Sequence, residues 1–182
     1  MKIKGNFLKD YVQTVRDTPD LAWDKYLTAE DWEIVRGQVI PLSWYPVETM
    51  GRIGKGLFEL RTQGKYELVR LHGRTRVDTL FDEGTRNFLT KGSPMDSLRA
   101  FSVIARRYID EVEIKVVKKE LNYCEVSWWP VDGAPGWDLF REIQAGTMER
   151  LVELNGGKKA KAEFRSEQMN GREACIICLR WE

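Results

Sequence analysis

The sequence predicts an α+β fold in which a helical N-terminal layer packs on a split, antiparallel sheet of about four strands. Apolar residues recur at helical spacing over much of residues 1–110, whereas they alternate with polar residues over most of 111–182. A long amphipathic segment interrupts the alternating part, which predicts the order strand–strand–helix–strand–strand. No Gly-rich or Pro-rich stretch is long enough to be a linker, so residues 1–182 are expected to form a single domain.

The N-terminal part carries helix start signals before its apolar stripes. Thr18-Pro19-Asp20 is typical of a helix start, with Thr as the N-cap and Pro at the first helical position. Thr28, followed by Asp31, predicts a short helix that ends near Gly37.

Three further helices follow from apolar spacing within residues 46–62, 66–83 and 94–110, the last of them capped by Ser93. Glycines recur in the first of these segments. Their absent side chains are expected to let another helix approach closely, within the chain or across a dimer. These glycines are Gly51, Gly54 and Gly56.

The C-terminal part predicts two strand pairs on either side of one helix. The first pair covers about 112–128 and turns at Leu121-Asn122, with alternating apolar residues facing one side. A helix over 137–154 ends at Asn155-Gly156-Gly157. The second pair contains Asn170-Gly171, a strong hairpin signal.

Composition excludes several classes of protein. There are 29 Lys and Arg against 28 Asp and Glu, a net charge of +1, which argues against nucleic acid as a partner. No apolar stretch is long enough to span a membrane. The N-terminus lacks the apolar core of a signal peptide, and an odd count of 3 Cys suggests a reducing compartment, so a cytoplasmic protein is expected.

No catalytic or metal-binding motif is visible, and the protein is expected not to be an enzyme. Cys175 and Cys178 have the spacing of a redox motif, but on a strand they would face opposite sides. His72 is the only histidine, so a His-rich metal site is excluded. It is interpreted as an ordinary satisfied or exposed side chain; the alternative is a haem ligand, with nearby arginines for the propionates. These are Arg70, Arg74 and Arg76.

Aromatic residues cluster beside Pro and Gly, where rigid rings often line clefts or interfaces. They favour an apolar ligand pocket between helices and sheet, the alternative being ordinary core filling. The candidate pocket residues are Trp44, Tyr45, Tyr108, Trp128, Trp137 and Phe140.

The segment Gln38–Pro46, with its Ile-Pro-x-Ser-Trp-Tyr-Pro pattern, resembles the signature of a family of uncharacterised myxobacterial proteins of similar length. More distantly, the C-terminal half resembles a superfamily of ligand-binding domains. Its members include the 4-vinyl reductase domain, the haem nitric-oxide-binding sensor and TRAPP transport-complex subunits. The similarity lies in the helix over 140–154, Gly156-Gly157, and the turn from Gly171 to Cys175.

The resemblance implies a helical layer on a split antiparallel sheet with a pocket between them. The first hypothesis is a non-enzymatic sensor or regulatory domain that binds a small apolar or aromatic molecule. The second is a dimeric interaction module of the TRAPP-subunit type, with a homodimer or a regulatory protein as partner. The Tyr-x-Ser-x-Arg motif with which the haem sensors hold the propionates is missing. No cofactor is therefore expected, with haem as the alternative.

Overall fold

The computed structural model describes residues 1–80, 92–128, 135–169 and 172–182. The N-terminal elements are β1 (Lys2–Lys4), α1 (Gly5–Asp17), the 3₁₀ helix η1 (Trp23–Lys25), α2 (Ala29–Arg36), β2 (Trp44–Pro46), α3 (Val47–Arg61) and α4 (Tyr66–Leu80). The remaining elements are α6 (Pro94–Ala105), β3 (Ile114–Glu120), β4 (Tyr123–Trp128), α7 (Trp137–Leu154), β5 (Lys161–Met169) and β6 (Arg172–Arg180).

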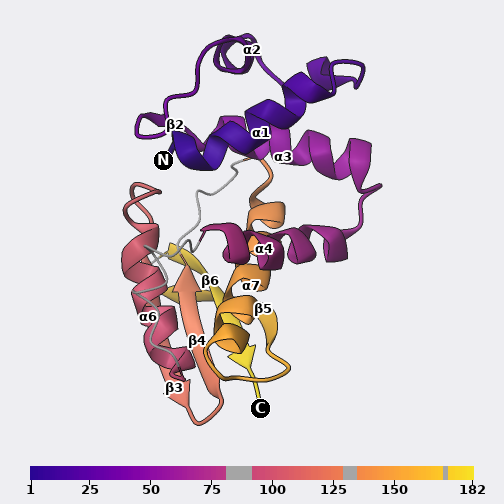
Figure 1. Cartoon of the computed structure of the whole chain (residues 1–182). Coiled ribbons are helices and arrows are strands. Elements are labelled where there is room, and N and C mark those ends of the chain that lie inside the picture. The colour runs from indigo at the N-terminus through magenta and orange to yellow at the C-terminus, as the bar shows by residue number, and fades with distance from the viewer. Residues whose placement is uncertain (81–91, 129–134, 170–171) are drawn as a thin grey trace.

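The elements form two layers with α4 lying across α7 (Figure 1). The first layer contains α1, α2 and α3, joined by a small antiparallel sheet of β1 and β2. The second contains α6, α7 and a sheet in the order β3-β4-β6-β5. The predicted α+β class is confirmed, including the single helix between two antiparallel strand pairs. The β1–β2 pair was not predicted.

Strand alternation sets the faces of the larger sheet. In β4, Cys124, Val126 and Trp128 are buried on the inner face, and Val126 lies opposite Ile177 of β6. Cys175 lies opposite Trp128, whereas Cys178 lies opposite Glu125 on the other face. The expectation that the two cysteines face opposite sides of the strand is confirmed. Asn170-Gly171, which predicted the hairpin, lies outside the described residues.

The helix starts were predicted unevenly. The Thr28 hydroxyl accepts from the Asp31 N–H and the Asp31 carboxylate accepts from the Thr28 N–H, a complete capping box for α2. The Ser93 hydroxyl caps α6 by accepting from the Asp96 N–H. The helix start at Thr18 is wrong, because Thr18 ends α1 and its carbonyl accepts the indole N–H of Trp23.

Two glycines of α3 accommodate close contacts within the chain, one with a loop and one with a side chain of the 3₁₀ helix η1. A Cβ on Gly51 would collide with the carbonyl of Pro135, in the segment before α7. A Cβ on Gly56 would stand 2.7 Å from the Trp23 ring. The expected close approach occurs, with a loop at Gly51 and with the Trp23 ring of η1 at Gly56.

Within the described ranges, no helix is long and apolar enough to cross a membrane. That residues 1–182 form one domain stays a prediction.

Candidate ligand cavity

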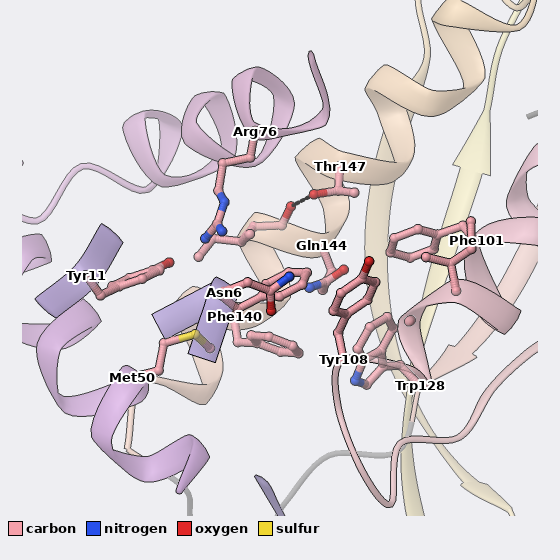
Figure 2. Close-up of a pocket in the computed structure, with 14 residues that line it drawn as sticks. Asn6, Tyr11, Met50, Arg76, Phe101, Tyr108, Trp128, Phe140, Gln144 and Thr147 are labelled. Carbon is pink, nitrogen blue, oxygen red and sulfur yellow. Dashed lines mark hydrogen bonds between the residues drawn. The ribbon is translucent and has the colours of Figure 1, made fainter. Parts of the chain in front are cut away.

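A cavity of about 100 Å³ lies between the two layers (Figure 2). The first layer and α4 contribute one side of its described lining, and α6, β4 and α7 contribute the other. From the former come Asn6, Phe7, Tyr11, Met50 and Arg76. From the latter, with the turn after α6, come Phe101, Ile104, Ala105, Tyr108, Trp128, Phe140, Ile143, Gln144 and Thr147.

Aromatic rings form much of the cavity wall. Trp128 meets Phe140 edge-on with ring centroids 5.5 Å apart, and Phe7 meets Tyr108 at 5.1 Å. These separations are typical of attractive aromatic pairs. The pairs come from strand, helix and turn, so they fix the cavity shape through several elements at once.

Arg76 is the cation of the cavity wall. Its guanidinium lies 5.3 Å from the ring centroid of Phe7 and 5.6 Å from that of Tyr11, within the range of cation–π attraction. Burial raises the pKa of the Tyr11 phenol, although the charge of Arg76 opposes this. Tyr11 is therefore a neutral hydroxyl at physiological pH.

Three buried polar atoms of the lining lack a hydrogen-bond partner within the described part of the chain. They are the side-chain oxygens Asn6 Oδ1 and Gln144 Oε1 and the indole nitrogen Trp128 Nε1. The Thr147 hydroxyl, by contrast, lies within hydrogen-bond distance of the carbonyls of Gly73 and Ile143. Buried polar groups are normally paired, so these three atoms, which have almost no accessible surface, are exceptions within the residues around the cavity.

The structure brings together three of the predicted pocket residues. Tyr108, Trp128 and Phe140 line the cavity, and Trp137 lines a smaller neighbouring cavity of about 30 Å³, which Phe140 also lines. A role for these residues in ligand binding stays a prediction.

Trp44 and Tyr45 line neither of these two cavities. Trp44 is 41% exposed on the short edge strand β2, where Lys4 Nζ lies 3.9 Å from the centre of its ring. The Tyr45 hydroxyl accepts the backbone N–H of Ile40 at 2.8 Å. Both side chains therefore help to hold the segment before α3.

His72 lines a cleft of about 240 Å³ next to the cavity, and the two share Tyr11 and Arg76. His72 meets the Tyr11 ring edge-on, with centroids 6.3 Å apart. Burial and the charge of Arg76 lower the pKa of His72, so its imidazole is neutral at physiological pH.

Sequence reasoning missed two polar residues of the cavity lining. Gln144 had a usable signal, because it stands on the apolar stripe of the predicted helix, one turn from Phe140 and from Thr147. Asn6 had none, because α1 was not predicted as an element.

No family model matches the sequence, and a comparison with curated proteins finds no match. The fold does match solved structures. One is an oxygen-binding H-NOX domain related to soluble guanylate cyclases, with TM-score 0.63 and 14% identity over 99% of this chain and 95% of that chain. The Fe(II) unliganded H-NOX protein from K. algicida gives TM-score 0.65 and 16% identity over 99% and 97%.

The fold is that of the H-NOX domains. A third similar structure comes from work on haem redox potential and protein-induced porphyrin distortion, with TM-score 0.62 and 14% identity over 98% of this chain and 99% of that chain. The expectation that no cofactor is involved is therefore corrected, because the proteins that share this fold point to haem. The relation to 4-vinyl reductase, TRAPP and myxobacterial proteins stays a prediction.

The cavity as arranged does not fit a haem. Its volume of about 100 Å³ is smaller than the ~150 Å³ cavity that holds one benzene ring, whereas a porphyrin has four pyrrole rings. The common protein ligands of haem iron are His, Cys, Met and Tyr. Among the described lining residues the candidates are Met50, Tyr11 and Tyr108, and burial disfavours the Tyr11 phenolate. His72 lines neither this cavity nor the smaller one beside it.

Proposed function

We propose that this chain is a non-enzymatic sensor domain whose cavity binds a small, largely apolar molecule. The observation that carries the proposal is the position of the cavity, whose lining comes from both layers and from α4. A ligand there contacts α1 and α7 at once. It therefore favours one spacing of the two layers over another, which is the differential affinity that a sensor needs.

Shape and chemistry both support a binding cavity. Ligand sites are typically concave and mostly apolar, with a few polar groups that orient the ligand. Here aromatic rings form much of the wall, and Arg76 adds a cation. The H-NOX domains that share the fold include one described as oxygen-binding, which supports small-molecule sensing as the general role.

One observation that favoured the alternative, a dimeric interaction module, is explained by contacts within the chain. The glycines proposed for a helix–helix seam, Gly51 and Gly56, contact Pro135 and Trp23 of the same chain. A homodimer or a regulatory partner remains compatible with the sensor proposal, since a change in layer spacing has to be transmitted to a protein surface.

Native mass spectrometry of protein purified from its own host tests the proposal. We expect an extra mass that leaves on denaturation, and a rise in melting temperature when that molecule is added back to stripped protein. Hemin is titrated in parallel and followed by its absorption in the visible range. Protein that carries no extra mass and shows no melting shift with hemin or with a library of apolar and aromatic compounds would refute the proposal.

A further inference from the structure

A larger hollow, the α3–α4 cleft, lies beside the cavity and has a volume of about 260 Å³. Its described lining comes from α1, α3, the residue after α3, α4 and α7. Much of this lining is apolar. The apolar side chains include Leu57, Phe58, Leu68, Val69, Leu139 and Ile143.

The size of the α3–α4 cleft fits an apolar chain. A cavity of about 150 Å³ holds benzene with its six carbons, so by the same ratio about 260 Å³ holds about ten non-hydrogen atoms. Leu139 and Val69 are buried in the lining, whereas Leu68 is 44% exposed. A ligand that covers Leu68 removes apolar surface from water, which favours binding.

Arg61 is the charged residue in the described lining of this cleft. It is exposed at the end of α3 and has no carboxylate partner among the described residues. A short turn joins the C-terminal end of α3 to the N-terminal end of α4 here (Figure 1). The opposite dipoles of the two helix ends offset one another, which leaves the charge of Arg61 to attract an anion.

The other end of the cleft is less favourable for an anion. His72 and Tyr11 line both the α3–α4 cleft and the neighbouring cleft of about 240 Å³. That neighbouring cleft is also lined by Asp10 and Arg76, so it carries charges of both signs. A carboxylate placed there would meet the Asp10 side chain, whereas at Arg61 it meets a cation.

We propose that the α3–α4 cleft binds an amphipathic monocarboxylate. A chain of about eight carbons lies inside the cleft, and the carboxylate pairs with Arg61. The planar guanidinium group matches a carboxylate well, because it can donate two parallel hydrogen bonds. This inference goes beyond the proposed function, since the site is separate from the cavity between the layers, although Tyr11 and Ile143 line both.

Octanoate and 1-octanol test the two parts of the site, because they share the chain and differ in the charged head. The readouts are the two Kd values and the ratio of the octanol Kd to the octanoate Kd, measured by calorimetry on the full chain at low ionic strength. We expect octanoate to bind about threefold to fivefold more tightly, the size of a partly exposed ion pair. Salt at about 0.5 M should remove most of this difference by screening the charges.

Arg61→Gln tests the head-group contact. It should bring the ratio close to one and leave the octanol Kd unchanged. Lys55→Gln is the matched control, because Lys55 is an exposed cation of the same helix that lines neither cleft. Both changes remove one positive charge, but only Arg61→Gln should alter the ratio.

Leu68→Ser tests the apolar wall. It should weaken octanoate and octanol alike, by about threefold, and leave the ratio unchanged. The matched control is Leu71→Ser, since Leu71 is 52% exposed on the same helix and lines neither cleft. Both leucines are exposed, so neither substitution should prevent folding, and melting temperatures check this.

Three outcomes would overturn the inference. Octanoate could fail to bind, or it could bind no more tightly than octanol. Binding could also stay unchanged in both Arg61→Gln and Leu68→Ser, which would place the ligand outside the α3–α4 cleft. None of these outcomes refutes the sensor proposal, which concerns the cavity between the layers and has its own test.

Discussion

Gly73 of α4 and Gly146 of α7 lie at one crossing, where the two helices approach backbone to backbone. A Cβ on Gly73 would collide with the carbonyl of Ile143, and a Cβ on Gly146 would collide with the carbonyl of Arg70. The hydroxyl of Thr147 donates to the Gly73 carbonyl across the same contact. Because α4 carries Arg76 and α7 carries Gln144, this crossing sets the distance between two walls of the cavity.

Gly146→Ala is expected to lower the free energy of unfolding by about 2–3 kcal/mol, because the helices must separate to accept the methyl group. Gly54→Ala is the matched control, since its Cβ would lie 3.9 Å from the Tyr11 ring, an ordinary contact. It should raise stability by about 0.5–1 kcal/mol, because Ala is the better helix former. Urea unfolding of the two variants measures both effects, and a similar change in both would contradict the close crossing.

Glu149 holds the same crossing together electrostatically. Its carboxylate is 5% exposed and accepts from Arg74 Nη1 at 2.9 Å and from the Ala162 backbone N–H at 2.9 Å, so it joins α4, α7 and β5. Glu149→Gln keeps the size but removes the buried charge that Arg70 and Arg74 share, while Glu142 and Glu153 still pair with these half-buried arginines. We expect a loss of about 2 kcal/mol in the free energy of unfolding.

The control for Glu149 is Asp78→Asn. Asp78 also connects α4 to α7, through Arg150 at 3.1 Å, but this pair is exposed to solvent. Exposed ion pairs contribute little, so the change should stay within about 0.5 kcal/mol in chemical denaturation. A loss as large as that of Glu149→Gln would show that burial of the carboxylate is not what matters.

Asp31 makes the stability of the first layer depend on pH. Burial raises the pKa of Asp31, but hydrogen bonds to its carboxylate outweigh this effect. Arg52 donates at 2.5 and 2.8 Å and the Thr28 N–H also donates, which holds the pKa at about 2. The folded pKa lies below the ordinary value of 3.8. The stabilisation is therefore fully present above about pH 5 and is lost as pH falls toward 2; at neutral pH it amounts to about 2 kcal/mol.

Asp31→Asn tests this dependence. The variant should be less stable than wild type at pH 7, and the gap should narrow as pH falls from 5 toward 2, as followed by urea unfolding at each pH. Asp20→Asn, at an exposed position, serves as the control and should follow the wild-type profile. A gap that stays constant with pH would mean that the lost contacts do not involve the charge of Asp31.

The sheet could be predicted from the sequence because alternation assigns each side chain to a face. Val126, for example, stands in the alternating segment over 112–128 and is buried on the inner face of the sheet. Helix α2 was predicted because Thr28 and Asp31 form a local cap. Helix α1 was missed because it lacks such signals: its N-cap is Lys4, with no side-chain hydrogen bond, and its first turn has no acidic residue.

The cavity could be predicted only in part, because its walls join residues far apart in the chain. Aromatic residues beside breaks pointed to Trp128, but the same rule selected Trp44, which lies exposed on an edge strand. Periodicity assigns a residue to one face of a helix or strand, but it does not predict which other element packs against that face. The contribution of Asn6 and Arg76 therefore appears only when the layers are packed.

Thiol labelling checks the strand faces chemically. Cys178 is partly exposed on the outer face of β6, whereas burial raises the pKa of Cys124 to about 12 and raises that of Cys175. Because the thiolate is the reactive form, native protein at pH 8 should show one fast thiol toward a disulfide reagent, and the other two should react on the order of 100-fold more slowly. Cys178→Ser should abolish the fast phase and Cys175→Ser should leave it intact. Fast labelling of Cys175 in native protein would place it on the outer face and contradict its register opposite Trp128 in the cavity wall.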